Sequence, residues 1–303
     1  MKDLHSILVV VDRNDDASQT VTKAVSLARQ FGARIELFLC DADQAYELAH
    51  AYDRNGVERA RELCIVEARE FLRELKAAAS APDLDISIDA DCASPLYEVT
   101  VRKALHSKPD LVIKSVRGGY RRGTVTDPND WQLMRACPCA LMLTRGREWR
   151  GHPRIAAAVD VSAKETAGLA QDVLQSARML SWCWNGEFDV LNSESQGEVP
   201  EDRAELRRLC DENRLASHRI HFLNGPPEAT LAPFADRQGY DVLVMGALSH
   251  RPQSGVLVGT LTSKLLDALD CDFVLVKPQS YQCPVEDGAV YGETRAQQQV
   301  GFG

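Results

Sequence analysis

The chain has 303 residues, 45% of them hydrophobic and 26% charged, a balance typical of a globular protein with one large domain or two smaller ones. Its formal net charge of −9 disfavours a nucleic-acid partner, because neutralising phosphates requires a basic face. No apolar run approaches the ~18 residues of a membrane span, so we expect no membrane partner and a cytoplasmic location.

The first half begins with a short β-branched run that ends in Asp12, and helical and strand-like stretches then alternate up to residue 144. A segment over 54–79 predicts an amphipathic helix of unusual length. Packing against the core is its simplest explanation, and a protruding interaction helix is the alternative. In chain order the other predicted elements are a strand over 6–12, a helix over 21–31, a strand over 34–39, a strand over 85–89, a helix after Pro95, a strand over 110–115 and a strand over 140–144.

The second half repeats this order. Residues 110–115 match 241–246 at an offset of 131, and residues 139–144 match 271–276 at an offset of 132. The strand over 154–160 ends in Asp160 as the first strand ends in Asp12. Because the predicted strands are short and almost wholly apolar, we expect an α/β fold of two tandem doubly wound domains, each with a parallel five-stranded sheet covered by helices on both faces. The predicted boundaries are 1–147, 152–280 and a polar tail over 281–303, loosely ordered beyond about residue 285.

Nine cysteines, an odd number, are scattered through apolar stretches rather than spaced as a disulfide framework, so we expect mostly buried, reduced thiols. Cys137 and Cys139 are separated by one proline, which is not the spacing of a zinc or redox pair. The sequence therefore indicates no metal site.

The segment over 245–260 follows a predicted strand and opens a helix near Gly259. Ligands of open parallel sheets bind at the carboxyl ends of strands, and glycines such as Gly246, Gly255 and Gly259 let backbone N–H groups approach a phosphate at a helix N-terminus. Asp160 would lie across the same crevice, where it could accept hydrogen bonds from a base or ribose. The alternative is that these are ordinary turn glycines and that Asp160 is a turn or cap residue.

These residues resemble the universal stress protein family, whose members carry an aspartate at the end of strand 1 and the motif G-x2-G-x9-G-(S/T) after strand 4. This chain has Gly246-x2-Ser249-x9-Gly259-Thr260 together with Asp160. The resemblance spans residues 5–286 as two copies and extends to the closing run from Lys277 to Glu286, which is similar to that of the tandem members.

The resemblance implies a Rossmann-like fold related to adenine nucleotide alpha hydrolases, a fused pseudo-dimer in which the last strands of the two halves pair, and an adenine nucleotide, ATP or AMP, in the second half. A further homodimer is left open. Ser249 stands in place of the motif's second glycine. A backbone conformation that is easy for glycine costs more free energy for serine, although the serine hydroxyl could bind phosphate. The implied nucleotide-binding residues are Val159, Asp160, Met245, Gly246, Ser249, Gly259, Thr260, Leu261 and Thr262.

The first half departs from the motif because it lacks the final glycine–hydroxyl pair. Asn129 or Asp130 is expected to cap the helix there, and a carboxylate at that N-terminus would repel phosphate. We therefore predict that the first half does not bind ATP in the usual way. A basic loop with Arg117, Arg121 and Arg122 could hold another anion, although simple solvation of the loop explains it as well.

We predict a stress-response regulator that is not an enzyme. The chain has no Walker lysine, and His250 is the one obvious candidate base in the loop. A ligand-independent scaffold or a binder of lipid-type or other small molecules is the alternative, and a slow ATPase that uses His250 is a third.

Overall fold

A computed structural model describes residues 4–13, 17–49, 54–116, 127–162, 168–184, 187–194, 199–251, 255–258 and 260–285. The first half consists of β1 (Ser6–Val10), α1 (Ala17–Phe31), β2 (Arg34–Cys40), α2 (Ala42–Ala49), α3 (Arg54–Ala78), β3 (Ile86–Asp91), α4 (Leu96–Ser107), β4 (Leu111–Ser115), α5 (Pro128–Ala136) and β5 (Ala140–Thr144). The second consists of β6 (Ile155–Ala158), α6 (Leu169–Trp182), β7 (Asp189–Glu194), α7 (Pro200–Glu212), the 3-10 turn η1 (Ser217–Arg219), β8 (Ile220–Asn224), α8 (Pro227–Gln238), β9 (Val242–Gly246), β10 (Leu248–Arg251), β11 (Gly255–Val258), α9 (Thr260–Ala268) and β12 (Asp272–Val276).

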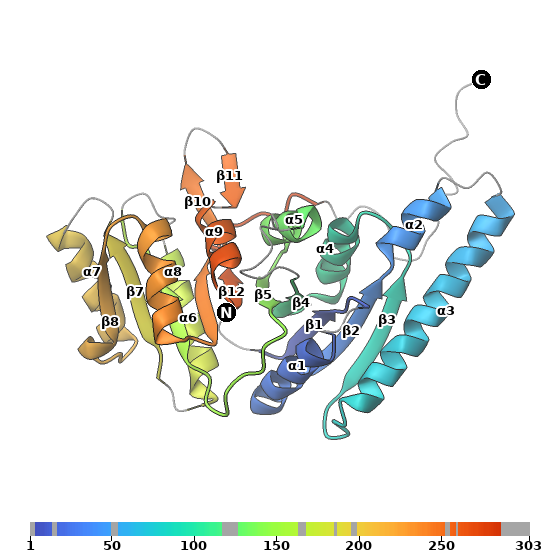
Figure 1. The fold of residues 1–303 in the computed structure, drawn as a ribbon, viewed down its shortest axis with the longest axis horizontal. Helices are drawn as coiled ribbons and strands as arrows, with labels where there is room; N and C mark the ends of the chain where they lie inside the picture. The colour runs from blue at the N-terminus through green and yellow to red at the C-terminus, as the bar shows by residue number, and fades with distance from the viewer. Residues whose placement is uncertain are drawn as a thin grey trace.

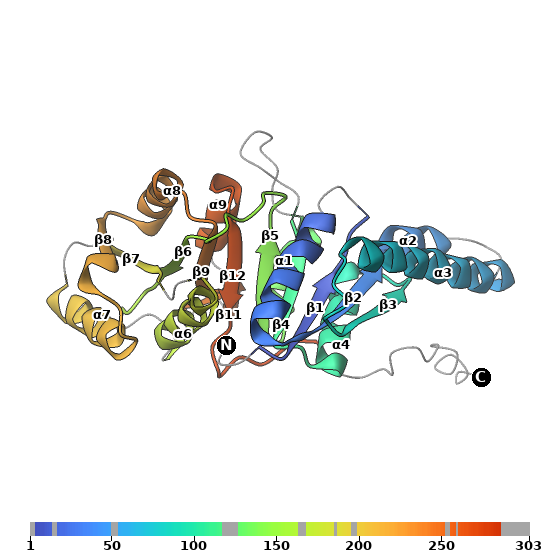
Figure 2. The same cartoon turned by 90° about the horizontal axis from the view of Figure 1, so that it is seen from below.

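Both halves contribute five strands to one ten-stranded sheet, in the order β3-β2-β1-β4-β5-β12-β9-β6-β7-β8 (Figure 2). Neighbours within each half are parallel, whereas β5 and β12 pair antiparallel at the centre (Figure 1). The predicted fold class is confirmed, and so is the predicted pairing of the two last strands. The pairing leaves neither strand with an exposed edge.

Helices cover both faces of the sheet, as the apolar strands predict. One core lies under α1, α3, α6 and α7, and the other lies under α4, α5, α8 and α9. β1, β4 and β12 are buried at every residue because each is covered on both faces, which explains their nearly continuous apolar sequences.

A buried ion pair joins the two halves beside the central strands. Lys23 on α1 lies 2.7 Å from Asp272 at the start of β12, and their side chains are 3% and 2% exposed. The indole of Trp149 and the backbone N–H of Arg145, both from the connection between the halves, donate to the same carboxylate. The contact between the two halves therefore combines the pairing of β5 and β12 with a buried carboxylate, that of Asp272, which accepts several hydrogen bonds.

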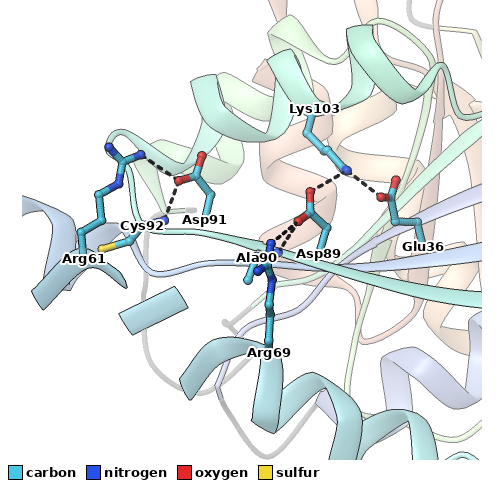
Figure 3. Close-up of polar contacts among 8 residues, drawn as sticks. All are labelled: Glu36, Arg61, Arg69, Asp89, Ala90, Asp91, Cys92 and Lys103. Carbon is cyan, nitrogen blue, oxygen red and sulfur yellow. Dashed lines mark hydrogen bonds and ion pairs between the residues drawn. The ribbon is translucent and has the colours of Figure 1, made fainter. Parts of the chain in front are cut away.

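The long helix α3 matches the predicted amphipathic helix to within a residue, and it packs along the edge of the sheet beside β3. Two aspartates on β3 anchor it, since Arg61 lies 3.0 Å from Asp91 and Arg69 lies 3.4 Å from Asp89 (Figure 3). Lys103 on α4 reaches Asp89 from the other side, and its amino group lies 2.9 Å from that carboxylate. Ala68 and Leu72 are fully buried, as core packing predicts, whereas Leu63 and Val66 of the same helix are 63% and 50% exposed.

Two elements were not predicted. The helix α2 follows β2 directly, and the two-stranded antiparallel ribbon β10–β11 stands where the sequence suggests a glycine-rich loop. In Figure 1 the ribbon projects beyond the end of the sheet. The predicted loose tail beyond residue 285 lies outside the described residues.

All nine cysteines are free thiols and six of them are buried, which confirms the prediction of mostly buried thiols. Within the described part of the chain, no group of three or more His, Cys, Asp or Glu side chains is arranged to hold a metal ion. None of the helices over the same residues is both long and apolar enough to cross a membrane.

Candidate functional site

A cleft opens in the second domain at the carboxyl ends of β6 and β9. β6 pairs with β7 on one side and β9 on the other, so the chain reverses its direction across the sheet at this point, where open α/β sheets bind ligands. The cleft encloses about 770 Å³ of empty space, counted out to its open mouth. Six of the nine predicted site residues line it, from three separate segments: Val159, Asp160, Met245, Gly246, Leu261 and Thr262.

The cleft is apolar over most of its wall. Leu169 and Val173 on α6 form one side, with Leu191 from β7 and Leu231 from α8 opposite. Asp160, just past β6, also lines the cleft. Its carboxylate accepts the backbone N–H of Ser162 at 2.8 Å, so Asp160 is also a turn residue, as the alternative interpretation held. A carboxylate has several acceptor positions, and this bond leaves it capable of others.

Gly246 is required by packing within the protein. A Cβ atom at this position would lie 2.7 Å from Cδ2 of Leu169, well inside normal contact distance. The sequence suggests that this glycine admits a ligand, whereas in the structure its missing side chain makes room for the first residue of α6. Gly246 and Leu169 together shape the floor of the cleft.

Val159 lines the cleft, and both of its backbone groups are already hydrogen-bonded within the protein. Its N–H donates to the carbonyl of Leu191 at 2.9 Å, and its carbonyl accepts the Asn192 side-chain amide at 2.9 Å. Thr262 is 2% exposed and lies in the first turn of α9, beside Leu261. The cleft is thus bounded at its far end by the start of that helix.

The predicted phosphate loop takes the form of the ribbon β10–β11. In it the backbone of Ser249 pairs with that of Leu257. The helix begins at Thr260, close to the predicted start. Gly259 lies outside the described residues, as do the side chains of Ser249, His250 and Thr260. The structure therefore places the ends of this segment at the cleft and leaves the phosphate contacts themselves as predictions.

The equivalent position in the first domain holds an ion triad, whose three residues line a second pocket. Lys114 replaces Met245 at the end of the strand, and its ammonium group lies 2.9 Å from both Asp12 and Asp130. Burial alone would lower the pKa of Lys114, but the charges of Asp130 and Asp12 outweigh it and raise that pKa, so the ammonium stays charged. The carboxylate that corresponds to Asp160 is thus bound by the protein's own cation.

The helix cap of the first domain differs from the prediction. Asp127 caps α5 by accepting the N–H of Asn129 at 2.7 Å, whereas Asn129 or Asp130 was expected to cap it. Pro128 occupies the first helical position, so the residue before it, Asp127, is the N-cap. Asp130 instead pairs with Lys114, a role that sequence reasoning missed. The sequence feature that could have indicated this pair is Lys114 at the end of an otherwise apolar strand, since a buried lysine needs a charged partner. Arg117, Arg121 and Arg122 lie outside the described residues.

Comparison with known proteins agrees with this architecture. The family model described as the universal stress protein family matches residues 4–145 and 156–277. Universal stress protein E of Photorhabdus laumondii is 23% identical over an alignment that covers 94% of this chain and 99% of that protein. Universal stress protein E of Escherichia coli is also 23% identical, with coverage of 93% and 96%.

Solved structures share the fold across both halves. A putative universal stress protein from Pseudomonas aeruginosa superposes with a TM-score of 0.66 at 20% identity and covers 91% of this chain and 94% of its own. A universal stress protein from Archaeoglobus fulgidus gives 0.67 at 12% identity, with coverage of 91% and 97%. The chain therefore belongs to the universal stress protein family and, with two matched copies in one polypeptide, is similar to its tandem members such as universal stress protein E.

Proposed function

We propose that this chain is a cytoplasmic stress-response regulator that binds one adenine nucleotide, ATP or AMP, in the cleft of its second domain. Membership of the universal stress protein family supports the stress-response role. The observation that carries the nucleotide proposal is that Asp160, Gly246 and Thr262, from three separate segments, line a single cleft. This cleft lies at the switch point of the sheet, where the first domain has an ion triad instead.

The shape and chemistry of the cleft support this ligand class. The leucine and valine walls suit the flat apolar faces of a purine, and Asp160 can accept hydrogen bonds from the base or the ribose. The first turn of α9 offers backbone N–H groups and the Thr262 hydroxyl to a phosphate.

We also propose that the bound nucleotide is not turned over. Hydrolysis needs a positioned base or nucleophile beside the phosphates. Among the described side chains that line the cleft, Asp160 is the single ionisable group, and the proposed binding mode assigns it to the base or the ribose. His250 is the rival candidate. A measured ATPase activity of the wild type that disappears in His250→Ala would overturn this part of the proposal.

Isothermal titration calorimetry of the full chain with ATP and AMP tests the binding proposal. We expect Gly259→Asp to abolish affinity by placing a carboxylate at the phosphate position, and Asp160→Asn to weaken it by about tenfold, the loss of one charge-assisted hydrogen bond. Asp41→Asn, which alters a carboxylate lining the first-domain pocket, is the matched control and should change nothing. Equal and negligible affinity of the wild type and Gly259→Asp for both nucleotides would reject the proposal.

The apolar walls also fit a second class of ligand, a lipid-type or other apolar small molecule. Mass spectrometry of the small molecules released when the purified chain is denatured distinguishes the two. An adenine nucleotide supports the leading proposal, whereas an apolar compound or an empty protein that also fails to bind nucleotide favours the alternative.

A further inference from the structure

A helix of the first domain touches the helix that begins at the second-domain cleft. Trp131 on α5 donates its indole N–H to the Ser263 hydroxyl on α9, at 3.0 Å. Ser263 belongs to the first turn of α9 and directly follows Thr262, which lines the cleft. α5 also packs against β11, so the first domain contacts both the ribbon and α9. Figure 1 shows α5 and α9 side by side near the middle of the molecule.

This contact lies across the pseudo-twofold axis. Trp131 and Ser263 are 132 residues apart, the same offset that relates the two last strands, so they occupy equivalent positions in the two halves. Trp131 is half-buried and packs against the core that the two halves share on this face. The indole thus lies in the packed contact between the halves, where its hydrogen bond is partly shielded from water.

The N-terminal end of α5 is fixed by the ion triad of the first domain. Asp130, the residue before Trp131, is 2% exposed and pairs with Lys114, which in turn binds Asp12. These ion pairs at the first cleft therefore anchor α5 to the ends of β4 and β1.

The C-terminal end of α5 is fixed by the closing segment of the second domain. Lys277 donates to the carbonyls of Met134 and Arg135, the latter at 3.0 Å, and Tyr281 also donates to the Arg135 carbonyl, at 2.5 Å. Cys283 donates to the Ala136 carbonyl at 3.2 Å. These bonds satisfy the last carbonyls of the helix, and the lysine charge matches the negative end of its dipole. α5 is therefore held at both ends.

We propose that Trp131 is a positioning residue for the second-domain nucleotide site, and that the first domain acts as a built-in support for the start of α9. This inference rests on the proposed function. A hydrogen bond from a rigid neighbour to the first turn of a helix keeps the N–H groups of that turn pointed at the ligand. Residues around a binding site generally hold in this way the residues that touch the ligand. The ion triad of the first domain thus contributes to binding in the second-domain cleft.

The test compares Trp131→Phe, Ser263→Ala and the double variant in the full chain. Phenylalanine keeps the ring packing and removes the N–H donor, so the fold is preserved. We expect each single variant to raise the Kd for ATP by about 3–10-fold, the range of one hydrogen bond, and the double variant to raise it no further than the larger single effect. Trp182→Phe, which alters a 75% exposed tryptophan on the opposite face, is the control and should leave the Kd unchanged.

Hydrogen exchange of the ligand-free protein provides a readout that does not require the nucleotide. Amides over residues 260–263 should exchange about 3–10-fold faster in Trp131→Phe than in the wild type and the Trp182→Phe control. Unchanged exchange in this turn would overturn the support role whether or not ATP binds. If the wild type binds no nucleotide but the exchange effect is present, the proposed function fails and the mechanical link between α5 and α9 stands. An unchanged Kd in Trp131→Phe, in a wild type that binds ATP, overturns the positioning role.

Discussion

Met142 and Val274 lie opposite each other in the antiparallel pair that β5 and β12 form at the centre of the sheet, and they are equivalent residues of the two halves. The pairs on either side, Leu141 with Leu275 and Leu143 with Phe273, are symmetric about them. The pseudo-twofold axis therefore passes between these two residues. The two clefts are placed symmetrically about this axis and differ in their lining, since a buried lysine, Lys114, stands in the first where Met245 stands in the second.

Lys114→Met should destabilise the protein strongly. The substitution leaves the buried carboxylate of Asp130 without its cation, and breaking a buried ion pair in this way costs about 3–5 kcal/mol. Urea denaturation followed by circular dichroism measures the change in the free energy of unfolding. Lys264→Met, at a lysine whose side chain is 58% exposed, is the control and should cost under about 0.5 kcal/mol. If Lys114→Met lowers the free energy of unfolding no more than Lys264→Met does, the triad does not hold α5.

Asp272→Asn should weaken the seam between the halves. Lys23 would keep its buried charge without a carboxylate, so we expect a loss of about 3–5 kcal/mol in the free energy of unfolding. Because the pair joins the two halves, the urea transition should also become broader or split in two. Asp267→Asn, at an exposed residue of α9, serves as the control. A single, unshifted transition in Asp272→Asn would contradict a structural role for the pair.

The closing segment predicts a distinct pH dependence of stability. Burial lowers the pKa of Lys277 to about 8, although the neighbouring thiols of Cys137, Cys139 and Cys283 act in the opposite direction. Between that value and the ordinary lysine pKa of about 10.4, the unfolded chain binds more protons than the folded one, so the free energy of unfolding rises with pH through this window. Below the window both states are protonated, and the folded state carries the full cost of burying the charge.

Lys277→Met removes this dependence. We expect wild-type stability to increase relative to Lys277→Met by about 1–2 kcal/mol between pH 8 and 10.5, less than the full shift implies because water still reaches this half-buried side chain. Urea denaturation of both proteins at several pH values gives the difference directly, and titrations shared by both proteins cancel. A difference that stays flat, or that falls as pH rises, would show that the ammonium group is not penalised in the fold.

The tandem fold could be predicted because an offset of about 132 residues survives in the strands, where burial on both faces permits little besides apolar residues. The ribbon β10–β11 could not, since its sequence lacks the alternation that marks a two-stranded unit. The packing of Gly246 against Leu169 could not be predicted either, because it depends on where α6 begins in space, and the approach of a ligand to Gly246 stays a prediction. The contact between Trp131 and Ser263 joins residues far apart in the sequence, and no local sequence pattern predicts it.

The number of nucleotides bound per chain tests the central claim most directly. Native mass spectrometry of the purified chain with saturating ATP should show a single nucleotide per polypeptide, and Gly259→Asp should bind none, because Lys114 pairs in the first cleft with Asp12, the counterpart of Asp160. Two nucleotides per chain would contradict this role of the ion triad. None bound to the wild type would contradict the nucleotide site itself.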